Sequence, residues 1–231
     1  MNGTPRFFLF LMLIIYTSCT RSADQEQYKT WRVYGGGNES IRYSALTQVD
    51  TSNVTQLQKA WTYHTGDADT AKNSQIQHNP IIIGNTLYGV TPRMKLFALN
   101  AATGQEQWVF NPLPDTTEVN HGISNNRGVA YWQNSDGSEQ RILYTAGSKL
   151  YSIDATTGKP DTSFAENGSL PLTEGLGLES DNLYVSATSP GIVYRDTFIL
   201  GSRVSEGADA APGDIRAFNV RTGELEWTFH T

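Results

Sequence analysis

The sequence has a single cysteine, Cys19, so no disulfide can form within the chain. Charged residues make up only 17% of it, and acidic residues outnumber basic ones by 23 to 17. This acidic balance argues against a nucleic-acid-binding surface. No stretch keeps a sustained helical spacing of apolar residues, so amphipathic helices are not expected. What the chain does have is 21 glycines and 11% aromatic residues, a composition that favours an all-β protein with many turns.

The first thirty residues have the pattern of an export signal. A basic residue precedes an apolar run, residues 7–16, which is too short to span a bilayer but fits the hydrophobic part of a signal peptide. Small residues then lead to Cys19, which resembles the lipobox of bacterial lipoproteins, although Tyr16 stands where a leucine is usual. We expect residues 1–19 to be a signal peptide with a lipobox-like end and residues 20–30 to be a polar tether. An ordinary cleaved signal with an unmodified cysteine is the alternative, and in both cases the mature protein is exported.

A pattern of strand, turn and strand occurs three times, at residues 96–110, 150–164 and 215–229. In each copy an Asn or Asp opens the turn, where its side chain can bond the backbone two residues on, and a Thr-Gly pair closes it. Four residues after the glycine, the first and third copies have Trp108 and Trp227, large apolar faces suited to packing between neighbouring sheets. The second copy has Thr162 at this position, so its packing must differ.

Each copy of the pattern lies in a unit that is expected to form four short strands. The strands are expected at residues 79–83, 85–91, 95–99 and 106–110, then 127–132, 141–147, 149–153 and a degraded fourth, then 191–195, 197–201, 214–218 and 225–229. Four antiparallel strands per unit, repeated along the chain, are typical of the blades of a β-propeller. The glycine-histidine and Trp-Asp signatures of the WD40 type are absent.

Three blades cannot close a ring, because propellers have roughly 4–8 of them. A further strand is expected at residues 59–66, around Trp61, with no unit of its own before it. It would complete the final blade of a ring, and that blade is missing here. We therefore interpret residues 31–231 as the N-terminal part of a longer β-propeller whose C-terminal blades are missing. On its own such a piece would expose apolar blade faces and unpaired strand edges.

The repeat resembles the tryptophan-docking motif of quinoprotein dehydrogenases, eight-bladed propellers that hold pyrroloquinoline quinone (PQQ) on their axis. Residues 34–67 look like the opening of the glucose-dehydrogenase-like branch, and SNNRGVAYW, ATSPGIVYRDTFILGSRVSE and IRAFNVRTGELEWTFHT are similar to that branch as well. The resemblance implies that three of eight blades are present. It further implies oxidation of a sugar or alcohol hydroxyl with PQQ as hydride acceptor. A divalent cation, usually Ca²⁺, would polarise the quinone, and a quinone or cytochrome would be the electron acceptor.

The resemblance implies that four residues contact PQQ. Arg127, in NNRG, stands where the family has an arginine that binds a PQQ carboxylate, and a guanidinium can hold a carboxylate through two hydrogen bonds. The alternative is a structural arginine bonded to carbonyls of its blade. Gln77 stands where several members have a PQQ-contacting glutamate, and Thr188 is close to the position of a contacting hydroxyl. Arg203 replaces a small residue of part of the family and could reach a PQQ carboxylate.

One residue, Glu206 in GSRVSE, matches the family's carboxylate ligand for the metal. Ca²⁺ takes about 6–8 oxygen ligands, so Glu206 cannot make the site alone. A solvated loop glutamate is the alternative. The family's catalytic aspartate has no counterpart in this chain, so no catalytic residue is predicted in it. His121 is a candidate for the mouth of the pocket or for a surface position. The three other histidines, His64, His78 and His230, lack metal-ligand spacing and are interpreted as structural.

A binding function without chemistry is the alternative to the enzyme. The scaffold lipoprotein of the outer-membrane β-barrel assembly machinery shares this repeat and a lipid anchor, and it binds protein partners without a cofactor. Arg127 and Glu206 favour the enzyme, because a scaffold has no use for charges on its axis. A remnant gene product that folds poorly is a third possibility. In the favoured interpretation the protein is periplasmic and contacts a bacterial membrane only through a lipid on Cys19.

Overall fold

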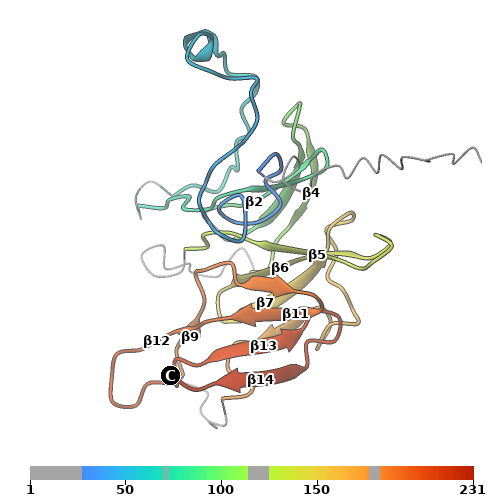
Figure 1. The fold of residues 1–231 in the computed structure, drawn as a ribbon. Coiled ribbons are helices and arrows are strands. Elements are labelled where there is room, and N and C mark those ends of the chain that lie inside the picture. The colour runs from blue at the N-terminus through green and yellow to red at the C-terminus, as the bar shows by residue number, and fades with distance from the viewer. Residues whose placement is uncertain (1–27, 70, 72, 114–124, 177–182) are drawn as a thin grey trace, which may run out of the picture.

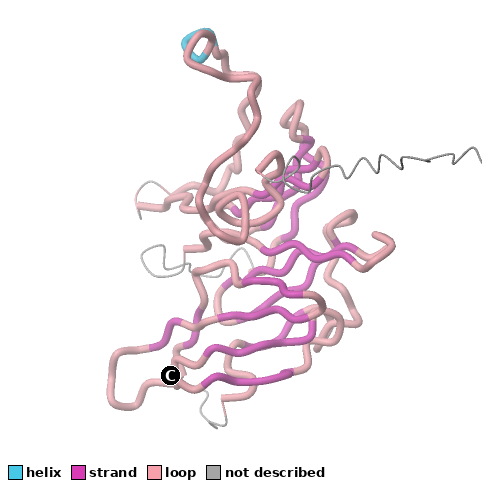
Figure 2. Tube along the Cα trace, viewed as in Figure 1, coloured by secondary structure: helices cyan, strands magenta, loops and turns pink. Residues whose placement is uncertain are grey.

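The computed structural model describes residues 28–69, 71, 73–113, 125–176 and 183–231. Within these residues the chain is all-β, with one short 3₁₀ helix, η1 (Val54–Gln56), on a long loop that projects away from the sheets (Figure 2). No helix in this part of the chain is long and apolar enough to cross a membrane. The predicted signal peptide with Cys19, most of the predicted tether and His121 lie outside the described residues.

Three four-stranded antiparallel sheets follow one another along the chain (Figure 1). The first sheet contains β1 (Ile81–Ile83), β2 (Thr86–Val90), β3 (Leu96–Asn100) and β4 (Glu106–Phe110). The second sheet contains β5 (Ala130–Gln133), β6 (Gln140–Ala146), β7 (Lys149–Asp154) and β8 (Ser169–Pro171). The third sheet contains β10 (Ile192–Tyr194), β11 (Thr197–Leu200), β13 (Ile215–Asn219) and β14 (Leu225–Phe229). A small two-stranded sheet pairs β9 (Val185–Ser186) with β12 (Arg203–Val204).

The predicted units of four antiparallel strands are confirmed, and three details differ. The fourth strand of the second unit is β8, which lies after the repeat copy and not within it. The small sheet of β9 and β12 was not predicted. The strand expected at residues 59–66 is wrong for the described chain, in which these residues pair with no strand. A strand needs a hydrogen-bonded neighbour, and none of the three sheets offers one there.

The turns of the repeat form as predicted in all three copies. The side chain of Asn100 accepts hydrogen bonds from the amides of Ala102 and Thr103, at 3.0 and 3.1 Å. Asp154 and Asn219 bond the equivalent amides of the second and third copies. The glycines that close the three turns have φ between +71° and +75° and are Gly104, Gly158 and Gly223. This left-handed conformation favours glycine, which explains why the repeat keeps it.

The interface between the first and second sheets, called the first junction, is built on a docked tryptophan. The ring of Trp108 in β4 lies on Gly158, where a Cβ would come within 2.5 Å of a ring atom. The Trp108 Nε1 donates a hydrogen bond to the carbonyl of Ala155, at 3.2 Å. Trp61 lies on Gly104 in the same way, with its Nε1 bonded to the carbonyl three residues before that glycine. A larger residue at either glycine would displace the ring.

The interface between the second and third sheets, called the second junction, has no tryptophan docked on its repeat glycine, Gly223. Thr162 occupies the position that is tryptophan in the other copies, and it lies in a turn and not in a strand. Gly223 faces Ala165 and Leu170, each with an atom between 3.0 and 3.3 Å from where a Cβ would stand. The amide of Ala165 donates to the carbonyl of Thr222, at 2.8 Å. The predicted difference in packing is therefore confirmed.

A buried arginine makes the hydrogen bonds that the tryptophan would make. Arg141 in β6 donates from Nη1 to the carbonyls of Val220 and Arg221, at 2.8 and 2.9 Å. Val220 stands three residues before its repeat glycine, as Ala155 does in the first junction. The Arg141 Nη2 lies 2.8 Å from the Asp161 carboxylate, which balances the buried charge. Burial lowers the pKa of Arg141, while Asp161 opposes this shift.

Each junction has its own apolar core. The first is filled by buried side chains of the first two sheets, among them Ile81, Leu96 and Ile142. The second is filled by side chains of the second and third sheets, among them Leu143 and Phe198. The three sheets therefore pack face to face in chain order, as successive blades of a propeller do.

The outer face of the third sheet has no neighbouring sheet in the described residues. Trp227, the tryptophan of the third copy, is 44% exposed, and Ile192, Tyr194 and Phe229 are more exposed still. The predicted exposure of an apolar blade face is confirmed. Trp108 and Trp227 hold the same position in the repeat. Trp108 packs on the glycine turn of the following sheet, whereas no such turn is present for Trp227 in the described residues.

The antiparallel order of the strands places the connections at two opposite ends of the sheets. The repeat turns lie at one end, called the turn end, together with the short turns that follow β1, β5 and β10. The other end, called the loop end, carries the segments that enter β1, β5 and β10 and the connection from β11 to β13. The long connections between the copies, which carry the predicted site residues, therefore lie at the loop end.

Candidate functional site

The residues predicted to contact a cofactor or metal all belong to connections at the loop end: Gln77, Arg127, Thr188, Arg203 and Glu206. The first three lie on the segments that enter the first strand of each sheet. We call residues 77–79, 126–128 and 187–190 the leading segments. Residues far apart in the sequence are thus brought to one end of the molecule.

Backbone hydrogen bonds join the three leading segments side by side. The amide of Asn79 donates to the carbonyl of Arg127, at 3.0 Å. The amide of Arg127 donates to the carbonyl of Thr188, at 2.9 Å. The middle segment is therefore held on both sides through the main chain of Arg127 itself, and the side chain takes no part in these bonds.

A cluster of polar side chains lies under the leading segments. The buried Asn126 accepts a hydrogen bond from the amide of Gly128, at 2.9 Å, and donates from Nδ2 to the carbonyl of Thr145 in β6, at 3.1 Å. Its Oδ1 is also 3.1 Å from Nδ1 of His78. The Thr145 hydroxyl donates to the carbonyl of Ala187, at 2.6 Å. One cluster thus reaches all three leading segments.

The imidazole of His78 is partly buried, and its Nε2 is shut off from solvent without a hydrogen-bond partner among the described residues. Desolvation lowers its pKa to about 4, against the smaller opposing effects of the bond to Asn126 and of the Tyr88 backbone. His78 is therefore neutral at neutral pH. Gln77, the next residue, is exposed, and its amide donates to the side chain of Gln75, at 3.1 Å.

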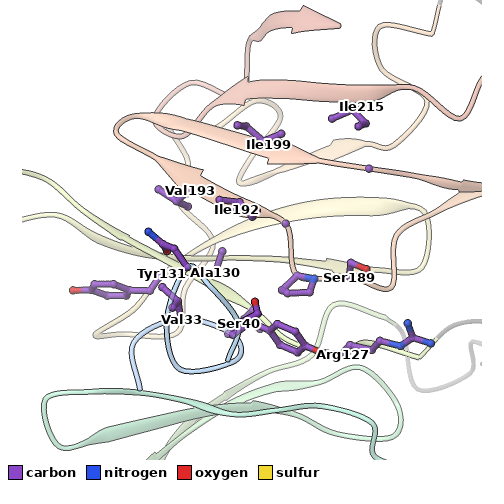
Figure 3. Close-up of a pocket in the computed structure, with 17 residues that line it drawn as sticks. Val33, Ser40, Arg127, Ala130, Tyr131, Ser189, Ile192, Val193, Ile199 and Ile215 are labelled. Atoms are coloured by element: carbon purple, nitrogen blue, oxygen red, sulfur yellow. The ribbon is translucent and has the colours of Figure 1, made fainter. Parts of the chain in front are cut away.

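Arg127 lies at the edge of a pocket of about 530 Å³. The pocket is formed by the N-terminal segment around Tyr34, by β5 and by the third sheet, and most of its lining is apolar. In Figure 3 the Arg127 side chain extends away from Ile192 and Ile199, so its guanidinium is not part of the apolar wall. Arg127 is exposed and makes no ion pair or side-chain hydrogen bond with the residues that the structure describes.

The N-terminal segment packs closely against the middle leading segment. A Cβ on Gly128 would come within 2.8 Å of the Tyr34 ring and 3.2 Å of Pro190. Glycine at position 128 therefore lets Tyr34 and the third leading segment approach the backbone next to Arg127. The Tyr34 hydroxyl in turn accepts a hydrogen bond from Arg42, at 3.2 Å.

Arg203 reaches the same end of the molecule through the small sheet. It pairs with Ser186, which lies two residues before Thr188 in the sequence. The neighbouring Ser202 accepts a hydrogen bond from the fully buried Arg216 of β13, at 2.8 Å. This buried guanidinium fixes the start of the loop that carries Arg203, whose own side chain is exposed.

Glu206 is exposed in the bend that follows β12, and the structure does not group it with other metal ligands. Across the described ranges, no three His, Cys, Asp or Glu side chains come close enough to hold a metal ion. A Ca²⁺ ion needs about 6–8 oxygens. Glu206 can therefore be at most one ligand of a site that other residues complete.

Arg127 was predicted from its motif, whereas the buried polar cluster beneath it was not predicted. His78 was interpreted as structural without a named partner, and Asn126 was not singled out. The signal for Asn126 was present, since a buried asparagine side chain is expected to be hydrogen-bonded and NNRG enters a strand. No sequence pattern links positions 78 and 126. They meet only because the first two leading segments lie side by side in the fold.

Comparison with known proteins gives consistent results. The profile of the family described as "PQQ: Glucose/ethanol/alcohol dehydrogenase, beta-propeller domain" matches residues 31–231. The quinoprotein glucose dehydrogenase of Escherichia coli (strain K12) is 34% identical over 222 residues, which cover 90% of this chain and 27% of that protein. Quinoprotein glucose dehydrogenase A of Acinetobacter calcoaceticus is 32% identical over 223 residues, with 87% and 28% covered.

The fold is similar to that of solved structures as well. The crystal structure of quinohemoprotein alcohol dehydrogenase from Comamonas testosteroni superposes with a TM-score of 0.70 at 25% sequence identity, and covers 90% of this chain and 28% of that one. The predicted fold, part of a propeller of four-stranded antiparallel blades, is therefore confirmed. The chain spans little more than a quarter of the length of these relatives.

Proposed function

Because the chain belongs to the PQQ-type glucose, ethanol and alcohol dehydrogenase β-propeller family, we propose that its loop end forms one part of the wall of a PQQ site. The enzyme would oxidise a hydroxyl group of a sugar or alcohol. A glucose dehydrogenase is favoured, because the relatives that are 34% and 32% identical are quinoprotein glucose dehydrogenases.

The observation that carries the proposal is the arrangement of the leading segments. Main-chain bonds hold Gln77, Arg127 and Thr188 on three adjacent segments at one end of the sheets. Arg127 adds an exposed guanidinium that no described side chain neutralises. The structural alternative, an arginine bonded to carbonyls of its own blade, finds no such bond among the described residues. An exposed cation fixed by its backbone suits an anionic ligand.

The residues of the chain fit parts of PQQ, which carries three carboxylates. Arg127 would hold one carboxylate through two parallel hydrogen bonds. Arg203 would supply a second cation, while the Gln77 amide and the Thr188 hydroxyl would donate hydrogen bonds to carbonyl or carboxylate oxygens. PQQ, when bound, supplies the hydride acceptor. No residue of this chain is assigned as the base that takes the hydroxyl proton.

The metal and the cellular setting belong to the same proposal. Glu206 would give one oxygen ligand to a Ca²⁺ ion beside the cofactor. The protein would be exported to the periplasm and held at a membrane by a lipid on Cys19. Electrons would leave through a quinone or a cytochrome.

The test is a titration of the full-length gene product that contains these residues, prepared without PQQ, followed by tryptophan fluorescence. We expect Arg127→Ala to weaken PQQ binding by about a hundredfold, because a charge-assisted bond at a partly desolvated site is worth about 2–3 kcal/mol. Arg127→Lys should recover part of the loss, since lysine keeps the positive charge but lacks the two parallel N–H donors of the guanidinium.

Arg195→Ala is the matched control, because Arg195 lies in the turn between β10 and β11, at the opposite end. It should leave the affinity unchanged. Wild-type affinity in Arg127→Ala would overturn the assignment of Arg127. A wild-type protein that does not bind PQQ would favour the scaffold alternative over the enzyme. For the metal, Glu206→Gln should weaken Ca²⁺ binding in the presence of PQQ.

A further inference from the structure

We propose that the hydrogen bond between His78 and Asn126 forms a clamp that positions Gln77 and Arg127 toward one ligand. His78 and Asn126 are then positioning residues of the cofactor site. The inference rests on the proposed function. His78 and Asn126 would touch no ligand themselves and would act through the residues next to them in the sequence.

The hydrogen bonds of Asn126 fix the orientation of its side-chain amide. Its Nδ2 donates to the carbonyl of Thr145, and its Oδ1 accepts from the amide of Gly128. The reverse orientation would place the NH₂ group against an N–H donor and the oxygen against a carbonyl. The oxygen therefore faces His78.

The orientation of Asn126 determines the tautomer of His78. An oxygen at 3.1 Å from Nδ1 can only accept, so Nδ1 carries the proton and donates it to Asn126. The ring is neutral, in agreement with its pKa of about 4. Nε2 is then left without a proton and has no partner within the described part of the chain. The useful contact of His78 is thus the bond from Nδ1.

The alternation of side chains along an extended segment explains how the clamp acts on its neighbours. Successive side chains of an extended chain point to opposite sides. Asn126 is buried and Arg127 is exposed, while His78 is partly buried and Gln77 is exposed. When His78 and Asn126 are fastened to each other on the inner side, Gln77 and Arg127 are therefore held on the outer side.

Two bonds set the spacing of the two segments. The first is the side-chain bond between His78 and Asn126, and the second is the backbone bond from Asn79 to Arg127. A single bond would let the segments turn about it, whereas two bonds at neighbouring residues fix both distance and direction. The hydroxyl of Thr145, which donates to Ala187, extends the same cluster to the segment that carries Thr188.

The test compares three variants of His78 in the full-length gene product, with PQQ affinity as the measurement. His78→Leu removes the donor and should weaken PQQ binding about tenfold, which corresponds to about 1.4 kcal/mol. His78→Asn can place an NH₂ group near the position of Nδ1 and should stay within about threefold of wild type, since 0.7 kcal/mol is about a factor of three. His78→Gln can place its amide only near Nε2 and should behave like His78→Leu.

Thermal unfolding of each variant separates positioning from loss of the fold. If His78→Leu does not fold, the comparison of His78→Asn with His78→Gln decides, because both carry the same amide group. Equal PQQ affinities of these two variants would overturn the clamp. Asn134→Ala, in the turn between β5 and β6 at the opposite end, is the control and should bind PQQ as wild type does.

A double variant distinguishes this inference from the proposed function. If the clamp acts through Arg127 and Gln77, the effect of His78→Leu should shrink by at least half when Arg127 is already alanine. Fully additive losses would overturn the clamp. A wild-type protein that does not bind PQQ would overturn the proposed function, whereas wild-type affinity in all His78 variants with a weakened Arg127→Ala would overturn the clamp alone.

Discussion

The two junctions between the sheets solve the same packing problem with different chemistry. In the first junction the ring of Trp108 covers Gly158, and one N–H group reaches the carbonyl of Ala155. In the second, the guanidinium of Arg141 reaches the carbonyls of Val220 and Arg221, and Asp161 balances its charge. The repeat turn is the same in both junctions. The residue that packs on this turn from the preceding sheet can therefore be a tryptophan or an arginine, provided that it donates a hydrogen bond to the turn carbonyl.

The difference shows what a docked tryptophan provides. It combines a large apolar surface with a single uncharged N–H donor, and the Tyr88 hydroxyl donates a second hydrogen bond to the same Ala155 carbonyl, at 3.0 Å. A guanidinium gives more donors but less apolar surface, and its charge must be balanced inside the protein. The second junction meets this need with Asp161 and with the ring of Trp132, which lies 5.5 Å from the Arg141 guanidinium. The first junction therefore depends on shape and the second on charge.

The largest effect is expected for Arg141→Ala, which leaves Asp161 and two carbonyls of the third sheet without their partner. Breaking a buried ion pair from one side costs about 3–5 kcal/mol. We expect the free energy of unfolding, measured in urea by circular dichroism, to fall by this amount. Arg141→Lys should lower the free energy of unfolding by about half as much, because lysine keeps the charge but lacks the several N–H donors of the guanidinium. A loss below 1 kcal/mol for Arg141→Ala would show that the apolar core alone holds the second junction.

A slightly smaller effect is expected for Trp108→Ala in the first junction. Trp108 is partly buried against the core of the first junction, so its truncation should cost about 3 kcal/mol, the lower end of the range for a buried tryptophan. Trp227→Ala is the matched control in this chain, because Trp227 holds the same repeat position without a glycine turn to dock on. Its cost should stay below about 1 kcal/mol, as for a largely exposed side chain. Equal losses for the two variants would mean that docking on Gly158 adds nothing.

The first junction should also weaken in acid, through His78. This residue lies where the first two sheets meet, and burial lowers its pKa from 6.5 to about 4. Between these values the unfolded chain binds the proton and the folded chain does not, so stability falls as the pH decreases from about 6.5 to about 4. The expected loss is at most about 3 kcal/mol, since one pKa unit corresponds to about 1.4 kcal/mol. His78→Asn should remove this part of the pH dependence, measured by urea unfolding at pH 7 and pH 4.5.

The smallest effect is expected at the exposed rim of the second junction. Arg221 and Glu139 form an ion pair at 2.6 Å, but about 40% of each side chain is exposed. Such pairs contribute about 0.2–1 kcal/mol, so Glu139→Gln should cost no more than that. Added salt should reduce even this difference between variant and wild type. A cost near that of Arg141→Ala would show that the whole network, and not the buried arginine, holds the sheets together.

Much of this comparison could be predicted from the sequence, because local patterns specify it. The Asn or Asp and the glycine of each turn act within a few residues, so the three repeat turns were predicted correctly. The strands on either side were also predicted correctly in the first and third copies, whereas the fourth strand of the second unit lies after its copy, at β8. Thr162 correctly indicated that the second junction is different. Arg141 was not predicted as its substitute, because in the sequence it is only a charged residue at the start of a strand. Its partners, Val220 and Arg221, lie in the repeat turn of the third sheet, far away in the sequence.

In the candidate site, too, some residues could be predicted from local motifs and others could not. Arg127 and Glu206 were found through motifs that surround them, whereas His78 and Asn126 were not connected. Their bond depends on which segments the sheets bring side by side, and a sequence without aligned homologues carries no sign of it. The assignments of Gln77, Arg127, Thr188, Arg203 and Glu206 to a ligand stay predictions until PQQ and Ca²⁺ binding are measured.

The order of docking has a consequence for how the protein is made. Trp61 precedes Gly104 in the sequence, and Trp108 precedes Gly158, so each tryptophan is synthesised well before the turn that covers it. A nascent chain therefore keeps the Trp61 indole uncovered until the turn of Gly104 is made, and the Trp108 indole uncovered until the turn of Gly158 is made. We expect folding on the ribosome to advance from the N-terminus one sheet at a time, with the most recent sheet as the segment that a chaperone would recognise.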